Sequence, residues 1–541
     1  MNDYVPYLAF VCIIAYQVKF NRLKRSKNIS SDTGGNTVNG SSLKSSKSLK
    51  GILDGELLYQ DNVPQIYLHK LVSLSDSFES KNLGNTKRRT IARHDSRDFL
   101  ANLQELLVKE QQGSSCSIEP VAYNKIINPN DYIISDIVRK QNSNKPSEAY
   151  IRAGPRAHIH FDPKEVNAAI VTCGGLCPGL NNVIRELVHS LYYLYDCSSV
   201  LGIIGGYNGF NGDYKAVKLT PEYVADCHHH GGTILASSRG GFDLEKIISF
   251  IDDHNINQLF IIGGDGTHRG AYRISHEVIK RGLNVAVAGI PKTIDNDVDL
   301  IDRSFGFQTS VEAAQAAILS AKTEAKCNLP NGIGIVKLMG RSAGYIAAHA
   351  TLASGDVDLC IVPEVPMNLY GCNGYLDFIE QRVKEQGHAV VVVAEGAGEE
   401  VLGESAEKDA GGNKKLPKIG EFLKSAIEGH FKSKSKVATV KYIDPSYMIR
   451  SVPANASDSL YCMLLAQNAV HGTMAGYTGF STGLVNNRMV YIPIPRLVES
   501  SPRVMDPNGR TWERVRAMTR QPQKTDLIDT SKYNVRGKTV I

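Results

Sequence analysis

Short apolar runs alternate with helical stretches from about residue 168 onward. Each run spans four to six residues, and several end on Gly, Pro or Asp. Such runs are typical of buried strands, and strands that alternate with helices predict an α/β fold on mostly parallel sheets. Ligands bind beyond the carboxyl ends of such strands, so we expect the chemistry there. The runs are Ala168–Val171, Val200–Ile204, Leu259–Ile262, Val285–Ile290, Ile333–Val336, Leu359–Val362, Val390–Ala394 and Ala438–Tyr442.

The run that ends at Ile262 leads into Gly263-Gly264-Asp265-Gly266-Thr267, and we expect a helix to begin near Gly270. A glycine turn before a helix N-terminus can seat a phosphate, because backbone N–H groups and the helix dipole favour an anion. Phosphate would repel Asp265 unless a divalent cation lay between them, so Asp265 is a candidate Mg²⁺ ligand. The alternative is a tight turn in which Asp265 caps the helix.

Two weaker stretches also suit a phosphate. Glycines in residues 174–179 form a second strand-to-helix turn, which is no Walker motif because it lacks Gly-Lys-Ser/Thr. Arg239, within Ser237-Ser-Arg-Gly-Gly241, can reach a nucleotide phosphate. A structural turn and a solvated loop arginine are the alternatives. The triplet at residues 228–230 is not predicted to bind metal, since consecutive histidines cannot all face one ion.

The run that ends at Ile290 is followed by Pro291-Lys-Thr-Ile-Asp-Asn-Asp297. Asp295 and Asp297 alternate, so in an extended chain both would point the same way. Two carboxylates on one side suit a metal ion and a general base, and Lys292 can neutralise phosphoryl charge. A polar turn is the alternative. With Asp265, these residues suggest phosphoryl transfer, which depends on positioning and charge neutralisation.

Three later strand ends supply further charged groups. Arg341 follows a buried run at an expected helix N-terminus, Glu395 lies among glycines, and Arg450 ends Pro445-Ser-Tyr-Met-Ile-Arg450. Arginines can hold a phosphate bidentately, and a carboxylate can accept hydrogen bonds from sugar hydroxyls. Each residue alone is also consistent with an ordinary surface charge.

Seven stretches occur in a fixed order: GGLCPGLN, SSRGG, GGDGT, PKTIDND, KLMGRSAGY, AEGAG and PSYMIR. Together they resemble the phosphofructokinase family, and more closely its ATP-using branch in plants and trypanosomatids, over residues 167–488. GGDGT alone is also similar to NAD kinases and diacylglycerol kinases, whereas the ordered series is specific. The resemblance implies two Rossmann-like three-layer domains whose mostly parallel sheets face each other across an active-site cleft.

The resemblance also implies residue roles. Asp295 would be the general base that takes the proton of the 1-hydroxyl of fructose 6-phosphate, and Lys292 and Thr293 would steady the transferred phosphoryl group. Asp265 would bind Mg²⁺. ATP would be held by Gly174, Arg239, Gly240, Gly264, Asp265, Gly266 and Thr267. The sugar phosphate would contact Thr293, Ile294, Asp295, Met339, Gly340, Arg341, Glu395, Tyr447, Met448, Ile449 and Arg450.

Gly266 bears on the phosphoryl donor. Family members that use pyrophosphate carry Asp there, and a carboxylate would collide with the α-phosphate of ATP, so Gly266 favours ATP. Lys292, by contrast, resembles the pyrophosphate users rather than the bacterial enzymes, which carry Gly.

The implied activity is ATP-dependent phosphorylation of fructose 6-phosphate to fructose 1,6-bisphosphate in glycolysis. One alternative is a pyrophosphate-dependent enzyme, which Gly266 opposes. The other is a catalytically silent regulatory subunit, which the intact Asp265, Asp295, Arg341 and Arg450 oppose. The family further implies a homotetramer, and control by AMP or another metabolite is an expectation.

Composition limits the class of protein, its partners and its cellular compartment. The 541 residues are 42% hydrophobic and 21% charged, as in soluble globular proteins. A net charge of +6 without a continuous basic stripe predicts no nucleic-acid partner. Ten cysteines without a CxxC pair indicate free thiols in a reducing compartment. The final Thr-Val-Ile differs from the peroxisomal Ser-Lys-Leu, so we expect a cytoplasmic protein.

The predicted domain order has five parts. Residues 1–50 hold an apolar segment (4–16), too short to span a bilayer comfortably, and a flexible linker. The segment is interpreted as a packed helix, with a membrane anchor or targeting signal as the alternatives. An accessory domain (51–160), with a helix over 95–110, precedes a nucleotide-binding α/β domain (161–325, with part of the C-terminal chain), a sugar-phosphate domain (326–490) and a C-terminal extension (491–541).

Two local features complete the expectations. Residues 398–416 are polar and glycine-bearing, and they predict a surface loop. Residues 455–472 have helical spacing, with Ser457-Asp458 as the expected cap.

Overall fold

The structure is a computed structural model that describes residues 72–73, 126–138, 148–371, 373–403, 416–499 and 501–522. All of them belong to the second of the two units of the chain, residues 62–541. The predicted features at residues 4–16, 28–50 and 95–110, and most of the 398–416 loop, lie outside the described residues. Across the described part of the chain, no helix is both long and apolar enough to span a bilayer.

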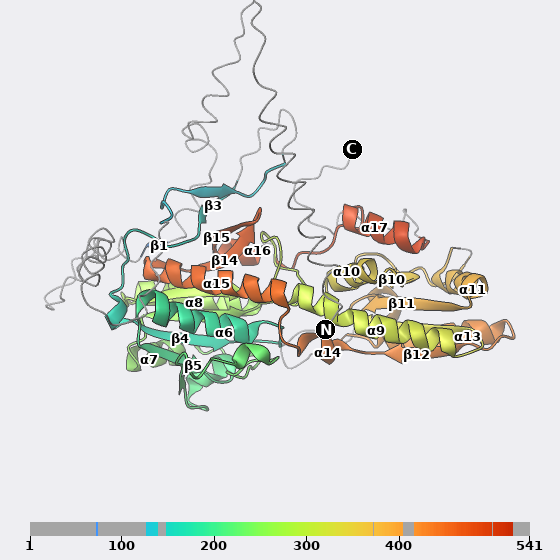
Figure 1. Ribbon diagram of the computed structural model, residues 1–541, viewed down its shortest axis with the longest axis horizontal. Coiled ribbons are helices and arrows are strands. Elements are labelled where there is room, and N and C mark those ends of the chain that lie inside the picture. Colours follow the sequence, from blue (N-terminus) through green and yellow to red (C-terminus); the bar gives the residue numbers. More distant parts are fainter. Residues whose placement is uncertain are drawn as a thin grey trace, which may run out of the picture. The chain divides into compact units, whose positions relative to one another are not determined.

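The larger sheet of the described chain has nine strands in the order β2-β3-β15-β14-β8-β7-β4-β5-β6 (Figure 1). The five strands from β14 to β5 are parallel, and the remaining neighbours are antiparallel. The bounds are β2 Tyr132–Ile134, β3 Ala149–Arg152, β4 Asn167–Thr172, β5 Ser199–Ile203, β6 Val217–Lys218, β7 Gln258–Gly263, β8 Ala286–Pro291, β14 Phe480–Val485 and β15 Arg488–Pro493.

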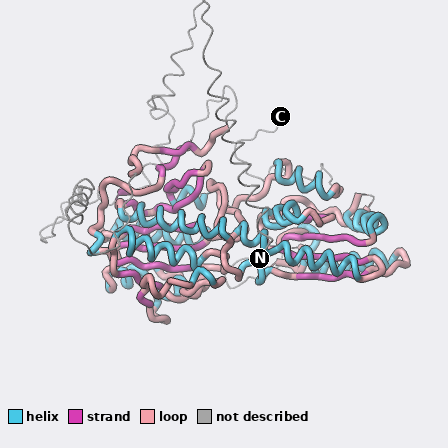
Figure 2. Tube along the Cα trace, in the orientation of Figure 1, coloured by secondary structure: helices cyan, strands magenta, loops and turns pink. Residues whose placement is uncertain are grey.

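Helices cover both faces of this sheet, as Figure 2 shows. Alternate residues of β4 point to opposite faces: Ala168 and Ile170 pack in the core under α6 (Leu180–His189) and α15 (Ala456–Met474). Ala169 and Val171 pack in the core under α7 and α8. This alternation follows from the period of two in a strand and produces three layers. The helices of the second face are α7 Leu244–Asp253, α8 Asp265–Lys280 and α16 Ile494–Glu499.

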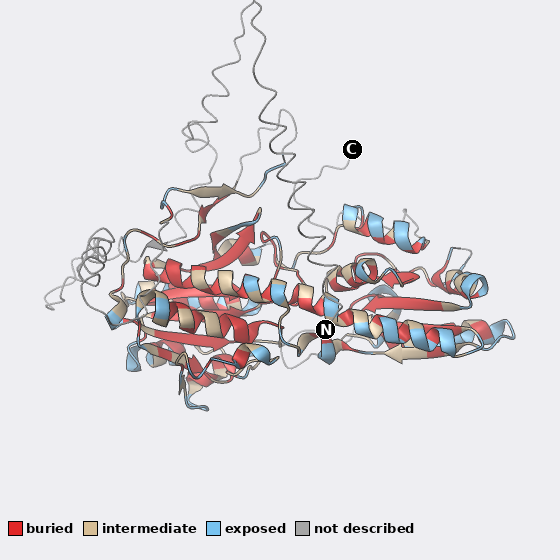
Figure 3. Ribbon diagram, in the orientation of Figure 1, coloured by how far each residue is buried: buried red, intermediate tan, exposed pale blue. Residues whose placement is uncertain are grey.

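The smaller sheet is parallel throughout, in the order β10-β11-β9-β12. Strands β9, β10 and β11 are red, and therefore buried, along most of their length in Figure 3, whereas the edge strand β12 is mostly intermediate. The strands are β9 Gly332–Leu338, β10 Leu359–Ile361, β11 His388–Ala394 and β12 Thr439–Ile443. The helices are α9 Phe307–Cys327, α10 Tyr345–Ser354, α11 Tyr375–Gln386, α12 Glu399–Leu402, α13 Ile419–Ser433, α14 Ser446–Arg450 and α17 Arg510–Thr519.

Short elements complete the described chain. Strand β1 pairs with β13 as a separate two-stranded ribbon. The bounds are β1 Val72–Ser73, β13 Tyr477–Thr478, η1 Pro163–Glu165, η2 Ser190–Leu194, η3 Gly206–Asn211 and η4 Cys227–His229.

The predicted α/β class is confirmed, and all eight predicted runs form parallel strands. The smaller sheet is parallel throughout, whereas the larger sheet is mixed, with antiparallel pairs toward both edges. Strands β14 and β15 were not predicted. Strand β14 is fully buried yet contains Ser481 and Thr482, so it lacks an apolar run. Its hydroxyl groups are satisfied locally, since Ser481 Oγ donates to the Gly289 carbonyl at 3.1 Å. Strands β2 and β3, from the predicted accessory region, extend the same sheet.

The predicted cap of α15 was wrong. Asn455 is the N-cap, and its Oδ1 accepts from the Asp458 N–H at 2.9 Å. The Asp458 carboxylate is buried and instead accepts from the backbone N–H and the hydroxyl of Thr309, at 2.8 and 2.6 Å. Sequence spacing did not reveal this second partner because Thr309 lies on another helix, α9.

We expect Asn455→Ala to lower the free energy of unfolding by about 1 kcal/mol, because it removes the cap of α15. Ser457→Ala is the matched control, since the Ser457 hydroxyl has only a long contact, 3.4 Å, with Arg303 Nη1. Denaturant unfolding of both variants would measure the difference. Equal losses in the two variants would contradict the assignment of Asn455 as the cap.

Candidate active site

A cavity of about 350 Å³ opens at the carboxyl ends of strands from both sheets. Residues that follow β8, β9, β11 and β12 contribute to its wall, as expected for parallel sheets. The wall carries both signs of charge, which suits a ligand that has an anionic group and hydrogen-bond donors. The lining residues are Arg239, Asp295, Asp297, Lys337, Met339, Arg341, Ser342, Glu395, Asp444, Ser446, Tyr447 and Arg450.

The glycine turn after β7 runs directly into α8. The helix begins at Asp265 rather than near Gly270 as predicted, and its N-cap is Gly264. Asp265 therefore sits in the first turn, and no side chain caps the helix. A Cβ added at Gly266 would have no atom within 4 Å, so the space beside the first turn is open. Burial, and then the charge of Asp297, raise the pKa of Asp265 to about 6.

Lys292 lies beneath the other glycine turn, after β4. It is buried, and its Nζ donates to the Gly175 carbonyl at 2.6 Å. Burial lowers the pKa of Lys292, and the positive charges of Arg239 and Arg450 lower it further. A Cβ at Gly175 would lie 3.9 Å from a guanidinium nitrogen of each of these arginines. The turn is thus surrounded by three cations, an arrangement that attracts phosphate.

The Lys292–Asp297 loop is a turn, not the extended chain that the alternation of Asp295 and Asp297 suggested. Asn296 has a φ of +57°, which reverses the chain between them, yet both carboxylates line the cavity. The Thr293 hydroxyl donates to Asp297 Oδ1 at 2.6 Å and accepts from the Asp295 N–H at 3.2 Å. The Thr293 hydroxyl therefore links Asp295 and Asp297 and stabilises the loop from within.

Asp295 is the most perturbed acid of the cavity. Its Oδ1 is buried and has no hydrogen-bond partner. Burial, followed by the charges of Asp297 and Glu395, raises the pKa of Asp295 to about 8, while the backbone N–H and charge of Arg341 oppose the rise. A carboxyl group with such a pKa is suited to proton transfer near neutral pH.

Arg341 and Glu395 face the cavity from the ends of β9 and β11. The Glu395 N–H donates to the Leu338 carbonyl at 2.9 Å, which ties the two strand ends together. A Cβ at Gly396 would lie 1.8 Å from the Arg341 carbonyl, so only glycine permits this approach. Burial raises the pKa of Glu395, and the charges of Lys337 and Arg341 oppose it.

Helix α14 supplies the last part of the wall. The Arg450 guanidinium lies 4.8 Å from the centroid of the Tyr447 ring, a cation–π distance. The side chains of Tyr447 and Met448 are 74% and 72% exposed, whereas Ile449 is buried in the core. Only Tyr447 and Arg450, of the four residues predicted here, line the cavity.

Comparison with known proteins agrees with this geometry. The family model described as phosphofructokinase matches residues 167–473. The chain is 55% identical over 384 residues to ATP-dependent 6-phosphofructokinase 7 of Arabidopsis thaliana, covering 70% of this chain and 79% of that protein. It is 54% identical over 388 residues to ATP-dependent 6-phosphofructokinase 1 of the same plant, covering 71% and 81%.

The chain belongs to the phosphofructokinase family. The predicted resemblance is thereby confirmed. Among solved structures, the pyrophosphate-dependent phosphofructokinase of Marinobacter aquaeolei aligns with a TM-score of 0.54 at 19% identity, over 66% of this chain and 92% of that one. At this identity the likeness shows the fold alone.

Within this phosphofructokinase, the predicted residues fall into two groups. Seven line the cavity: Arg239, Asp295, Met339, Arg341, Glu395, Tyr447 and Arg450. The others lie outside its lining, at the glycine turns and the start of α8, in the surrounding loops, or on α14: Gly174, Gly240, Gly264, Asp265, Gly266, Thr267, Lys292, Thr293, Ile294, Gly340, Met448 and Ile449.

Sequence reasoning missed four lining residues: Lys337, Ser342, Asp444 and Ser446. Lys337 Nζ and Asp444 Oδ2 form an ion pair at 2.7 Å, and Asp444 Oδ1 accepts from the Ser446 hydroxyl at 2.6 Å. Both charged residues stand at the carboxyl ends of neighbouring parallel strands, β9 and β12. Their position at strand ends is the feature by which the sequence could have identified them as lining residues.

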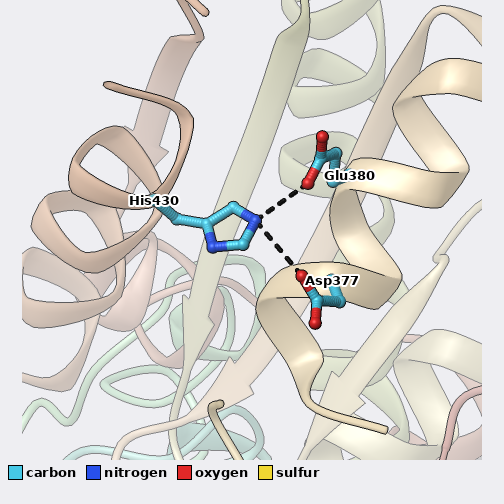
Figure 4. A group of neighbouring side chains, drawn as sticks. All are labelled: Asp377, Glu380 and His430. Atoms are coloured by element: carbon cyan, nitrogen blue, oxygen red, sulfur yellow. Dashed lines mark hydrogen bonds and ion pairs between the residues drawn. The ribbon is translucent and has the colours of Figure 1, made fainter. Parts of the chain in front are cut away.

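A second charged cluster, drawn in Figure 4, contains none of the residues that line the cavity. His430 Nε2 approaches Glu380 at 3.0 Å and Asp377 at 3.6 Å, residue types that can bind metal. However, Lys434 Nζ contacts both carboxylates at 3.0 and 2.5 Å, and Lys436 Nζ contacts Glu380 at 2.7 Å. Two ammonium groups on the carboxylate oxygens oppose a cation, so we assign the cluster as an ion-pair network.

Proposed function

We propose that this phosphofructokinase transfers the terminal phosphoryl group of ATP to the 1-hydroxyl of fructose 6-phosphate, forming fructose 1,6-bisphosphate in glycolysis. The names of its relatives support the donor and the activity. The observation that carries the mechanism is the buried Asp295 Oδ1, which has no partner and lines a cavity with Arg341 and Arg450. This oxygen is free to accept a proton from a bound hydroxyl.

In the proposed reaction, each charged residue of the site has a separate role. Asp295, in its ionised form, takes the proton of the 1-hydroxyl as the oxygen bonds to phosphorus. Arg341 and Arg450 hold the sugar phosphate, and Glu395 accepts from its hydroxyl groups. The open space at Gly266, together with Lys292 and Arg239 beside Gly175, receives the nucleotide phosphates.

Asp265 fits a divalent cation. Its carboxylate is partly buried, and the negative charge of Asp297 adds to the rise in its pKa, which the positive charge of Arg269 offsets only in part. Oxygen ligands of this kind suit Mg²⁺. When bound, Mg²⁺ neutralises charge on the transferring phosphoryl group.

The pyrophosphate-dependent alternative is less favoured because Gly266 leaves room for an α-phosphate. A silent regulatory subunit is less favoured because Asp295 and the arginines share one cavity. The homotetramer, the control by AMP or another metabolite and the cytoplasmic location stay predictions from the resemblance.

We expect wild-type protein to form fructose 1,6-bisphosphate with ATP and Mg²⁺ but not with pyrophosphate, in a coupled assay that compares the two donors. Gly266→Asp should reduce turnover with ATP by about 100-fold or more, because a carboxylate would meet the α-phosphate. The variant should fold, since its Cβ meets no atom within 4 Å.

Gly429→Asp is the matched control for that experiment. Gly429 is also an exposed helical glycine whose added Cβ has no atom within 4 Å, but it lies on α13 rather than at the glycine turn that leads into α8. Its activity should equal that of wild type. Normal ATP turnover by Gly266→Asp would refute the donor argument.

Asp295→Ser should lower kcat by about 10³-fold, because general-base catalysis is lost while the substrate-binding arginines remain. Calorimetric titration with fructose 6-phosphate should give near-normal affinity. Turnover close to wild type would mean that another group accepts the proton.

The pH dependence tests the coupling between the two aspartates. Below its pKa of about 8 the free enzyme holds Asp295 protonated, so kcat/KM should rise with pH as the proton is lost. Asp297→Asn removes a negative charge that raises this pKa, so the rising limb should move to lower pH. Profiles of kcat/KM between pH 5.5 and 9, recorded for wild type and Asp297→Asn, would measure this displacement of the rising limb. An unmoved limb, or one displaced to higher pH, would show that Asp297 does not act on Asp295.

A further inference from the structure

The segment Ser501–Met505 lies beyond the family-matched residues 167–473, yet it packs against the Lys292–Asp297 loop. The Arg503 N–H donates to the Asp297 carbonyl at 2.5 Å. The Ser501 hydroxyl oxygen accepts from the Asp299 N–H at 3.1 Å. Two backbone positions just after the proposed base are thus fixed by a part of the chain about 200 residues away.

The Arg503 side chain reinforces the same loop. Its Nη2 donates to the Asn296 carbonyl at 3.2 Å, and its Nη1 contacts the Ile301 carbonyl at 3.4 Å. Asn296 is the residue with a φ of +57°, a left-handed conformation that Asn adopts more readily than most other non-glycine residues. The guanidinium charge also opposes the rise in the pKa of Asp297. Arg503 therefore supports the reversal that turns both aspartates toward the cavity.

The other end of the segment is attached to the smaller sheet's helix α10. The Tyr345 hydroxyl donates to the Val504 carbonyl at 2.9 Å, and the Tyr345 ring lies 5.1 Å from the Arg503 guanidinium carbon. The Met505 N–H donates to Glu364 Oε1 at 2.8 Å. The same buried carboxylate accepts from the Gly344 N–H at 2.9 Å, three residues after Arg341.

The segment consequently joins two loops that contribute to one cavity. On one side it holds the turn that carries Asp295, which follows β8 of the larger sheet. On the other side it holds the turn after Arg341, which follows β9 of the smaller sheet. Residues 501–505 themselves are absent from the cavity lining. The effect on chemistry must act through position.

We propose that Arg503 is a positioning residue of the phosphoryl-transfer site, which sets the Asp295 turn relative to Arg341. This inference rests on the proposed function and adds to it a residue that touches neither nucleotide nor sugar. A displacement of about 1 Å at reacting groups can cost on the order of 100-fold in rate, so removal of the guanidinium should act on kcat.

The test compares Arg503→Ala with Arg510→Ala in the full chain. Arg510 is a matched control because its guanidinium is exposed on α17 and only approaches Glu513 at 3.9 Å. With ATP and fructose 6-phosphate, Arg503→Ala should lose about 10- to 100-fold in kcat with little change in either KM. Arg510→Ala should match wild type.

Two further measurements separate positioning from general destabilisation. Free guanidinium at millimolar concentration should restore part of the kcat of Arg503→Ala and none of that of Asp295→Ser. Hydrogen exchange of the backbone amides in residues 292–305 should be faster in Arg503→Ala, with the amides of β9 and β11 unchanged. Arg503→Lys, which keeps the charge but not the two-nitrogen fork, should lie between wild type and Arg503→Ala.

The outcomes are distinct. If kcat of Arg503→Ala stays within about twofold of wild type, or falls without guanidinium rescue, the positioning role is refuted. If Arg503→Ala does not fold, the kcat of Arg503→Lys, compared with that of wild type, tests the positioning role in its place. If wild type itself lacks activity, the proposed function fails, and unchanged exchange in residues 292–305 would then refute the positioning role independently.

Discussion

Repulsion among carboxylates is the constraint on which this site depends. Asp295, Asp297 and Glu395 line one cavity, and the charges of the latter two raise the pKa of Asp295. Such a cluster persists only where surrounding cations and hydrogen bonds hold it. Arg341 offsets the charge of Asp295, Lys337 that of Glu395, and Thr293 and Arg503 that of Asp297. Burial, followed by the repulsion that remains, raises the pKa of Asp295 and of Asp265, which suits the roles proposed for them as base and cation ligand.

The fold supplies the geometry for this arrangement. Parallel strands of two sheets end at the cavity, so the loops after β8, β9, β11 and β12 bring their polar residues together. One hydrophobic cluster runs from the larger sheet through α9 and α10 to β9 and β11, and fixes the sheets against each other. The loops supply the polar residues of the cavity, while the buried strands supply the hydrophobic core that stabilises the fold.

Electrostatics also distinguishes the cavity from the other acidic cluster of the described chain. At Asp377, Glu380 and His430 the carboxylates are neutralised by Lys434 and Lys436, and the pKa of Glu380 is lowered to about 2, first by Lys434 and then by Lys436. In the cavity, burial instead raises the pKa of Asp295, Asp297 and Glu395, whereas hydrogen bonds from Lys337 and Ser446 overcome burial and lower the pKa of Asp444. Similar residue types thus give an ion-pair network in one place and a reactive site in the other.

The features that the sequence by itself determined are those set by residues close together in the chain. The eight apolar runs, the glycine turns and the ordered motifs identified the strands, the family and seven lining residues, because each depends on neighbouring residues in the chain. Tertiary structure alone decided that Asp295 and Asp297 face the cavity through a reversed turn at Asn296, rather than along an extended strand. It also decided the pairing of Lys337 with Asp444 and the contact of Arg503 with Asn296, residues 207 positions apart. No pattern in a sequence encodes such contacts locally, since folding brings their partners together only when distant strands pack.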